Sequence, residues 1–183
     1  MDNSRIILGI DPGSNIMGYG LIKVEEKKTS IMIMGTITQG KGSDHYDKLK
    51  HIFEQVLEII DQYHPDEVAL EAPFFGKNVQ SMLKLGRSQG VAMAAALYRG
   101  LPIFEYAPLK VKQSITGMGA ASKEQVAYFL QKIYGFTELP STLDATDAVA
   151  VAVCHFIQSS RLVHTKDFKN WDDFIKKNPH RVK

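Results

Sequence analysis

Residues 5–13 read Arg-Ile-Ile-Leu-Gly-Ile-Asp-Pro-Gly, an apolar, β-branched run that stops at a turn signal. Such a run is typical of a buried β-strand, and it places Asp11 at the carboxyl end of that strand. Two more β-rich runs follow near residues 18–24 and 30–39, with short connections between them. Three consecutive strands joined in this way predict an antiparallel meander.

Helices and strands alternate through the rest of the chain. Apolar residues recur at helical spacing from about 44 to 63, which predicts a helix with one face on a sheet, ended by His64-Pro65. The pattern then predicts a strand at 67–71, a helix at 78–99, a strand at 101–106, a short helical piece at 110–114, a helix from the capping box at 122–125 to about 134, and an apolar helix from about 140–144 to 158. This order predicts an α/β fold, with a mixed sheet that has helices on both faces.

Length and composition indicate a soluble, single-domain protein and exclude several other classes. The 183 residues suit one domain with a core and a short appendage, and 44% hydrophobic with 23% charged residues is typical of a soluble globular protein. No apolar run is long enough to span a membrane and no secretory signal is recognisable, so we expect a cytoplasmic protein. The single cysteine, Cys154, excludes an internal disulfide and a cysteine-rich zinc site. The net charge of +2 is too small to indicate nucleic-acid binding by itself.

Four carboxylates stand where they could meet. Asp11 ends the first strand and Glu71 ends the fourth, and ligands collect outside the carboxyl ends of parallel neighbours. Asp144 and Asp147 are three residues apart at a helix start, which puts both on one face. Crowded carboxylates are tolerated when cations bind between them, and oxygen-only ligands favour Mg²⁺ or Mn²⁺. Two such ions could hold a scissile phosphate for phosphodiester hydrolysis.

Each carboxylate also has a purely structural interpretation. Asp144 and Asp147 could simply complement the helix dipole, with Asp144 at the third helical position after a capping Ser141. Asp11 could be a turn-forming residue before Pro-Gly. Glu71 has no obvious capping or salt-bridge role at the end of its strand. The hypothesis of a metal site therefore rests on the four occurring together.

Several sequence motifs resemble those of RuvC Holliday-junction resolvases, and they occur in the same order from about residue 5 to 155. The residues that carry the resemblance are Gly9-Ile10-Asp11-Pro12-Gly13-Ser14, Gly18-Tyr19-Gly20, Leu70-Glu71 with Lys77-Asn78, Lys84-Leu85-Gly86-Arg87, Phe104-Glu105-Tyr106-Ala107, Val111-Lys112-Gln113, Gly117-Met118-Gly119 and Asp144-Ala145-Thr146-Asp147-Ala148. The resemblance implies an RNase H-like fold with a five-stranded mixed sheet. It also implies a homodimer whose two Mg²⁺-dependent sites nick opposite strands of a four-way junction, alongside the RuvAB branch-migration complex in bacterial recombination and repair.

The resemblance also assigns residues by position. It makes Asp11, Glu71, Asp144 and Asp147 the catalytic, metal-binding set, Phe74 an aromatic that engages DNA bases, and Lys112 and Lys123 basic residues of the DNA-binding and catalytic region. From about residue 159 the chain becomes basic and polar, which suggests a nuclease domain at 1–158 and a basic tail at 159–183 that could contain a short helix. Two departures matter: Ala72-Pro73 follows the glutamate where many relatives differ, and the resemblance fades beyond about residue 160.

Several residues could contact DNA on physical grounds. Lys123 follows the probable N-cap Ser122, where a cation opposes the helix dipole, so we expect it either to hold a phosphate or to swing into solvent. Of the pair Phe74-Phe75, we expect the first to stack on a base and the second to be partly buried. A phosphate-tracking groove could be lined by Lys77, Lys84, Arg87, Lys110 and Lys112, although Lys84 and Arg87 could equally be a solvated helix face.

A stripe of small residues, Gly86, Gly90 and Ala94, could let another backbone come close to the second helix. The partner would be the sheet beneath it or the same helix of a second subunit. Two other functions stay open: a nucleotide-binding phosphotransferase of the actin and sugar-kinase type, and a non-catalytic nucleic-acid-binding module on the same fold. The first would need a second domain and an adenosine site, and the second would lack one of the four acids.

Overall fold

The computed structural model describes residues 4–26, 28–38, 44–73, 78–137, 140, 142–165 and 175. Within them, one sheet has the strand order β3-β2-β1-β4-β5. Its strands are β1 (Arg5–Asp11), β2 (Ile16–Glu25), β3 (Lys28–Thr38), β4 (Glu67–Glu71) and β5 (Ile103–Tyr106). The first three strands pair antiparallel, while β4 lies parallel to β1 and β5 parallel to β4. The expected meander and the expected mixed sheet are both confirmed.

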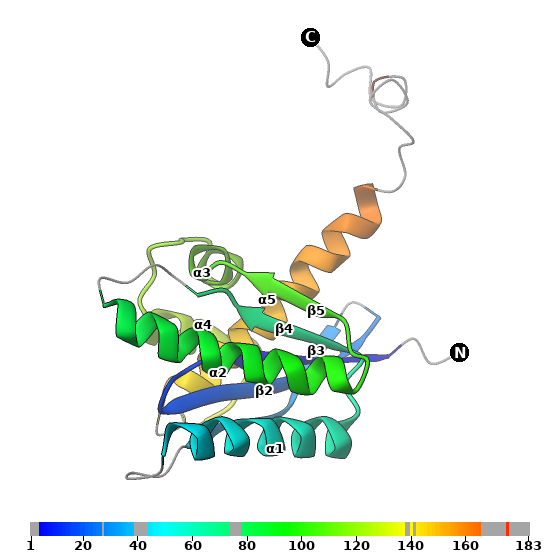
Figure 1. Cartoon of the computed structure of the whole chain (residues 1–183). Helices are drawn as coiled ribbons and strands as arrows, with labels where there is room; N and C mark the ends of the chain where they lie inside the picture. The colour runs from blue at the N-terminus through cyan, green and yellow to red at the C-terminus, as the bar shows by residue number, and fades with distance from the viewer. Residues whose placement is uncertain are drawn as a thin grey trace.

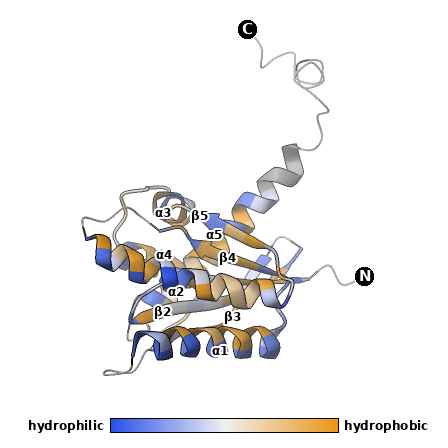
Figure 2. Cartoon of the chain, in the orientation of Figure 1, coloured by the Kyte–Doolittle hydropathy of each residue, from blue (hydrophilic) through white to orange (hydrophobic). Residues whose placement is uncertain are grey.

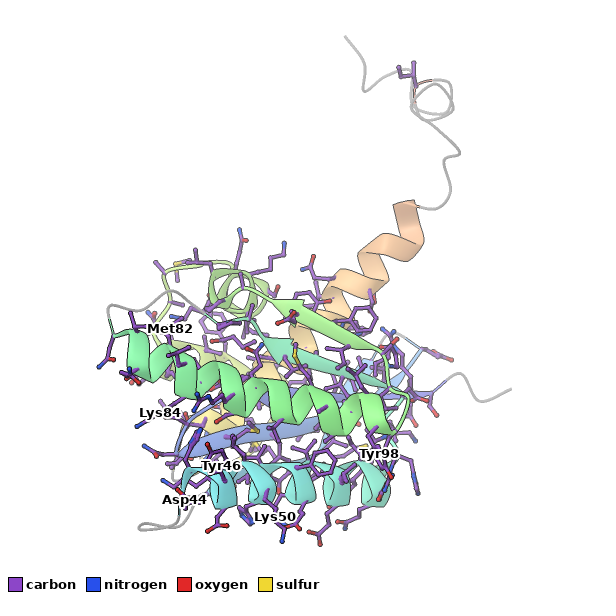
Figure 3. All side chains as sticks on the ribbon, viewed as in Figure 1. Asp44, Tyr46, Lys50, Met82, Lys84 and Tyr98 are labelled. Carbon is purple, nitrogen blue, oxygen red and sulfur yellow. The ribbon has the colours of Figure 1, made fainter. Side chains whose placement is uncertain are left out.

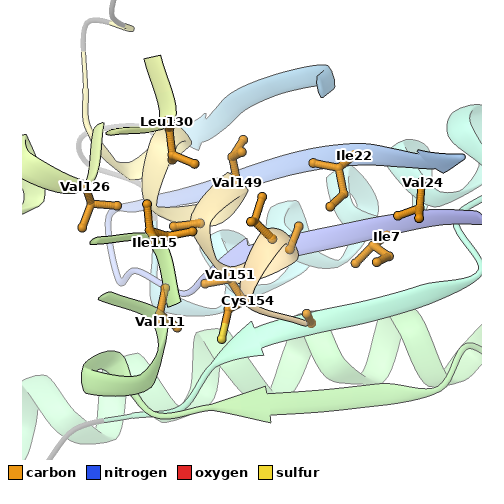
Figure 4. Packing of buried hydrophobic residues seen from close by; sticks show 14 of the residues in the cluster. Ile7, Ile22, Val24, Val111, Ile115, Val126, Leu130, Val149, Val151 and Cys154 are labelled. Atoms are coloured by element: carbon orange, nitrogen blue, oxygen red, sulfur yellow. The ribbon is translucent and has the colours of Figure 1, made fainter. Parts of the chain in front are cut away.

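Helices cover both faces of the sheet (Figure 1). One face carries α1 (His45–Tyr63) and α2 (Val79–Tyr98), and the other carries α3 (Pro108–Thr116), α4 (Lys123–Tyr134) and α5 (Asp144–Thr165). Each face of the sheet carries its own hydrophobic core. Successive strand residues point to opposite faces, so β1 supplies Leu8 to the core under α1 and α2 and Ile7 to the core under α3, α4 and α5. Figure 4 shows the second of these cores in close-up. Figure 2 shows the same logic in α1, whose hydrophobic side faces the sheet.

The helix α5 lies against the backbone of β1 and β2 because glycines face it. A Cβ atom on Gly9 would come within 2.1 Å of the Ala148 carbonyl oxygen, and one on Gly18 within 1.9 Å of the Asp144 carbonyl oxygen. Gly18 is also the residue that pairs with Asp11 in the antiparallel register. The start of α5 is therefore held over the end of β1.

The helix boundaries agree with the sequence patterns except at two places. The capping box of α4 is present, with Ser122 and Gln125 each accepting the other's backbone N–H. The expected short piece at 110–114 is a full helix over 108–116, which begins at a proline and ends at Gly117. The last helix runs to 165 rather than to about 158, because no proline or glycine follows to end it.

The helix α5 thus crosses the expected division at 158/159, and most of the basic tail lies outside the described residues. Among the helices that the structure describes, none combines the length and the apolar character required to span a membrane.

Candidate metal centre

The two strand-end carboxylates leave the sheet at the same edge. β1 and β4 are parallel neighbours in which Ile10 pairs with Leu70, so Asp11 and Glu71 follow side by side. Their proximity is also felt electrostatically, because the charge of Glu71 raises the pKa of Asp11. The expected convergence of these two residues is confirmed.

The start of α5 adds two more carboxylates. Carboxylate oxygens of Asp11, Asp144 and Asp147 all lie within 4.8 Å of one another. Asp147 and Asp11 are mostly buried, with side chains 11% and 14% exposed, whereas Asp144 is 30% exposed. The three-residue spacing puts Asp144 and Asp147 on one face of α5, and packing of α5 on Gly18, opposite Asp11, brings that face to the cluster.

Lys123, at the first position of α4, points its ammonium group into this cluster. Its Nζ lies 2.5 Å from Asp147 Oδ2, 3.6 Å from Asp144 Oδ1 and 3.8 Å from Asp11 Oδ2. The ammonium group is therefore held by carboxylates, whereas the sequence left open whether it holds a phosphate or turns into solvent. The unfavourable placement of a cation near the helix N-terminus is offset by three neighbouring carboxylates.

A single ammonium group does not neutralise this site. Burial raises the pKa of Asp11 from 3.8 to about 8; the charge of Glu71 adds to the rise and Lys123 opposes it. Burial likewise raises the pKa of Glu71 and of Asp147. The pKa of Lys123 is also raised, because its contacts with the carboxylates outweigh the effect of burial. The site thus holds more negative charge than the protein compensates.

A divalent cation fits this donor set. Asp147 Oδ2 is buried and accepts no hydrogen bond of standard geometry, even though Lys123 Nζ is close to it. Unpaired buried carboxylate oxygens are costly unless a cation or a proton neutralises them. All the donors are oxygens, which hard cations such as Mg²⁺ and Mn²⁺ prefer.

Two polar residues border the carboxylates from other elements. Lys112 on α3 is half-buried, and its charge lowers the pKa values of Glu71 and Asp147, which burial raises. Gln89 on α2 donates from Nε2 to Glu105 Oε1 at 2.9 Å and, more weakly, to the carbonyl oxygen of Glu71 at 3.4 Å. Together with Asp11 and Glu71, Gln89 lines a hollow beside the cluster.

Sequence analysis did not single out Gln89. A signal was available, because Gln89 occupies a buried position, 5% exposed, on a helix face otherwise made of small side chains. Buried amides need hydrogen-bond partners, and here the partners include the backbone that carries the strand-end glutamate.

Other expected site residues stand apart from the cluster or cannot be placed. Phe74, Phe75, Lys77 and Ser141 lie outside the described residues. Lys110 lines a separate hollow at the end of α3, and Lys84 lines one between α1 and α2.

The small-residue stripe of α2 does not pack on the sheet. A Cβ atom added to Gly86 or Gly90 would meet nothing within 4 Å, and Ala94 is exposed. The expectation that the sheet lies beneath this stripe is therefore wrong. The sheet contacts instead the face that contains Ala92, Ala95 and Ala96.

Known proteins resemble this chain in both sequence and fold. The family model "Crossover junction endodeoxyribonuclease RuvC" matches residues 7–155. Proteins with that same name from Christiangramia forsetii and Bacteroides fragilis are 59% and 60% identical to this chain; the matches cover 100% and 98% of it, and 95% and 96% of the relatives. The structure of Thermus thermophilus RuvC in complex with a Holliday junction substrate has a TM-score of 0.79 at 30% identity, over 85% of this chain and 94% of that chain.

Proposed function

This chain belongs to the RuvC family of crossover junction endodeoxyribonucleases, and we propose that it resolves Holliday junctions by nicking two opposing DNA strands symmetrically. It is an endodeoxyribonuclease with an RNase H-like fold. The observation that carries the proposal is the meeting of Asp11, Asp144 and Asp147 at one point beside Glu71. That arrangement suits cleavage of a phosphodiester bond aided by metal ions.

Nucleases of this family are metal-dependent, and the acidic cluster could hold a cation. We propose that the cation is Mg²⁺, with two ions per subunit and Mn²⁺ as a substitute, held by Asp11, Glu71, Asp144 and Asp147. When bound, such ions would lower the pKa of the attacking water and stabilise charge on the leaving oxygen. The carboxylates must lose their protons first, and Lys123 favours that loss through its positive charge.

Residues of the chain itself would hold the DNA around that centre. The Lys123 side chain, which is half exposed, could contact a phosphate oxygen as well as Asp147. Lys112 supplies a second positive charge from α3. We also propose Phe74 and Lys77 as DNA-contacting residues, on the strength of their positions in the sequence just after Glu71.

A homodimer would explain two cuts in one junction, and we propose that it forms through one face of α2. The small residues Gly86, Gly90 and Ala94 run along this face. Large apolar side chains that are more than half exposed lie on the same helix: Val79, Leu83, Leu97 and Tyr98. An apolar helix face of this kind is normally covered, and a two-fold axis would pair it with itself. Action in the cytoplasm with the RuvAB complex is part of the same proposal.

The two other functions considered are not favoured. Family membership over residues 7–155 argues against a phosphotransferase. A non-catalytic module would be expected to have lost an acidic residue, and the four are present.

A cleavage assay on a synthetic four-way junction tests the proposed function. With Mg²⁺, we expect paired nicks at symmetric positions on opposing strands and no cleavage of a linear duplex with the same sequence; EDTA should stop the reaction. Glu71→Gln should abolish cutting while retaining junction binding, since the carboxylate acts on metal and the amide keeps its shape. A variant that cuts at a rate near wild type would refute the assignment of Glu71.

A further inference from the structure

A second hollow, of about 220 Å³, opens near the carboxylate cluster, between α1 and α2. Its polar lining comes from three segments: Ser14 and Asn15 after β1, His45 and Lys48 at the start of α1, and Lys84 and Ser88 on α2. Figure 3 shows Lys84 at the same end of the two helices as Asp44, the residue that caps α1. The hollow therefore lies between the start of α1 and the first half of α2.

This hollow has an excess of positive charge. In the part of the chain that the structure describes, no carboxylate forms an ion pair with Lys48, Lys84 or Arg87. Arg87, which lies between two of the lining residues on α2, instead donates from Nη1 to His45 Nε2 at 3.1 Å. Lys48 is half-buried, so its charge is shielded less by water than that of an ordinary surface lysine. Cations gathered without acidic partners favour an anion.

Residues that line this hollow are close in sequence to residues of the metal centre. Ser14 and Asn15 come three and four residues after Asp11. On α2, Leu85 and Gln89 line the hollow that contains Glu71. The residues immediately before them, Lys84 and Ser88, line the hollow between α1 and α2, which we call the basic hollow. The same turns of one helix thus border both sites.

We propose that this basic hollow binds a backbone phosphate of the junction DNA near the phosphate that is cleaved. Two lysines supply the charge, while the hydroxyl group of Ser14 and the amide of Asn15 offer hydrogen-bond donors. Such a contact would set the register of the strand across the carboxylates and would carry no base specificity. The inference rests on the proposed function, because it assumes that junction DNA is the substrate.

Junction affinity in EDTA, measured from low to high salt, tests the proposal without cutting. Lys48→Gln and Lys84→Gln should each reduce the slope of log affinity against log salt, and loss of the whole phosphate contact in the double variant should reduce it by about 0.9 for each occupied hollow. The same relation predicts roughly eightfold weaker binding of the double variant per hollow at 0.1 M salt, a difference that vanishes towards 1 M. Lys48→Arg should restore much of the affinity, since it keeps the charge.

Lys50→Gln is the matched control. Lys50 lies two residues from Lys48 on the same helix, contacts Glu54, and projects away from α2 in Figure 3. It should leave both affinity and slope unchanged. If the Lys48 and Lys84 variants behave like this control, the hollow does not bind phosphate. If the wild-type chain itself fails to bind junctions, the proposed function is at fault instead.

Uncharged methylphosphonate linkages, placed one at a time around the cleavage site, would identify the bound phosphate. One linkage should weaken binding to wild type but have little further effect on the Lys48→Gln and Lys84→Gln variants, because the partner is already lost. Additive losses at every linkage would overturn the proposal. Inorganic phosphate at millimolar concentration is a second probe of the hollow. It should compete with junction DNA more strongly in wild type than in the two lysine variants, and equal competition in all three proteins would also overturn the proposal.

Discussion

Replacing Asp11 with asparagine should stabilise the metal-free protein at alkaline pH. The Asp11 pKa rises from 3.8 to about 8 on folding, so the folded state binds more protons than the unfolded state between these values. The stability contributed by protonated Asp11 is therefore complete below about pH 4 and is lost as pH rises through about 8. Asparagine keeps the shape of the side chain and removes the charge that causes this loss.

The size of the effect follows from the same shift. A difference of about four pKa units corresponds, at about 1.36 kcal/mol per unit, to on the order of 5 kcal/mol at most. Entry of water and movement of Lys123 when Asp11 ionises would recover part of that cost. We therefore expect Asp11→Asn to gain about 1–4 kcal/mol at pH 8, as other proteins do when a poorly compensated buried charge is replaced.

Thermal unfolding in EDTA at pH 5 and pH 8 measures this gain. For a chain of this length each kcal/mol corresponds to a rise in Tm of about 2–4 °C. The variant should exceed wild type at pH 8 and approach it at pH 5, and added Mg²⁺ should raise the Tm of wild type much more than that of the variant. Asp47→Asn, an exposed acid in the first turn of α1, should give no such gain.

The expectation fails if Asp11→Asn is no more stable than wild type at pH 8 in EDTA. That result would mean that the ionised carboxyl is well compensated without metal. Electrostatics would then no longer favour a cation site at the end of β1.

Three further outcomes are expected. Lys123→Ala should reduce junction cutting in Mg²⁺ by at least about tenfold while binding of Mg²⁺ keeps the chain folded, because the ammonium group beside Asp147 is lost; a large fall in Tm with normal cutting by the folded fraction would contradict this. Gly18→Ala should weaken Mn²⁺ binding in calorimetry and lower the Tm, because the new Cβ atom would collide with the Asp144 carbonyl; an unchanged Mn²⁺ affinity and an unchanged Tm would refute the close packing of α5 on this glycine. Gly90→Arg should shift the chain from dimer to monomer in analytical ultracentrifugation, and an unchanged dimer would show that α2 is not the interface.

Local patterns in the sequence were enough to predict most elements and part of the site. The apolar run before Asp11 and the alternation of helices and strands predicted the mixed sheet, because side-chain periodicity reports which face of an element is buried. The capping box at Ser122 was also predicted, since it depends on residues only three apart. Convergence of Asp11 and Glu71 was predicted on the condition that their strands are neighbours, and the parallel pairing of β1 with β4 meets that condition.

Contacts between distant elements decided the rest. The sequence could not tell whether Asp144 and Asp147 merely favour a helix start, and packing of α5 on Gly18 is what brings them to Asp11. Local patterns did not place the Lys123 ammonium group among the carboxylates, although the family resemblance assigned this residue to the DNA-binding and catalytic region. The spacing of apolar residues along a helix predicts which face is buried, but it does not predict which neighbouring element covers that face. For this reason the exposed stripe of α2 and the basic hollow between α1 and α2 were visible only once the helices had been packed on the sheet.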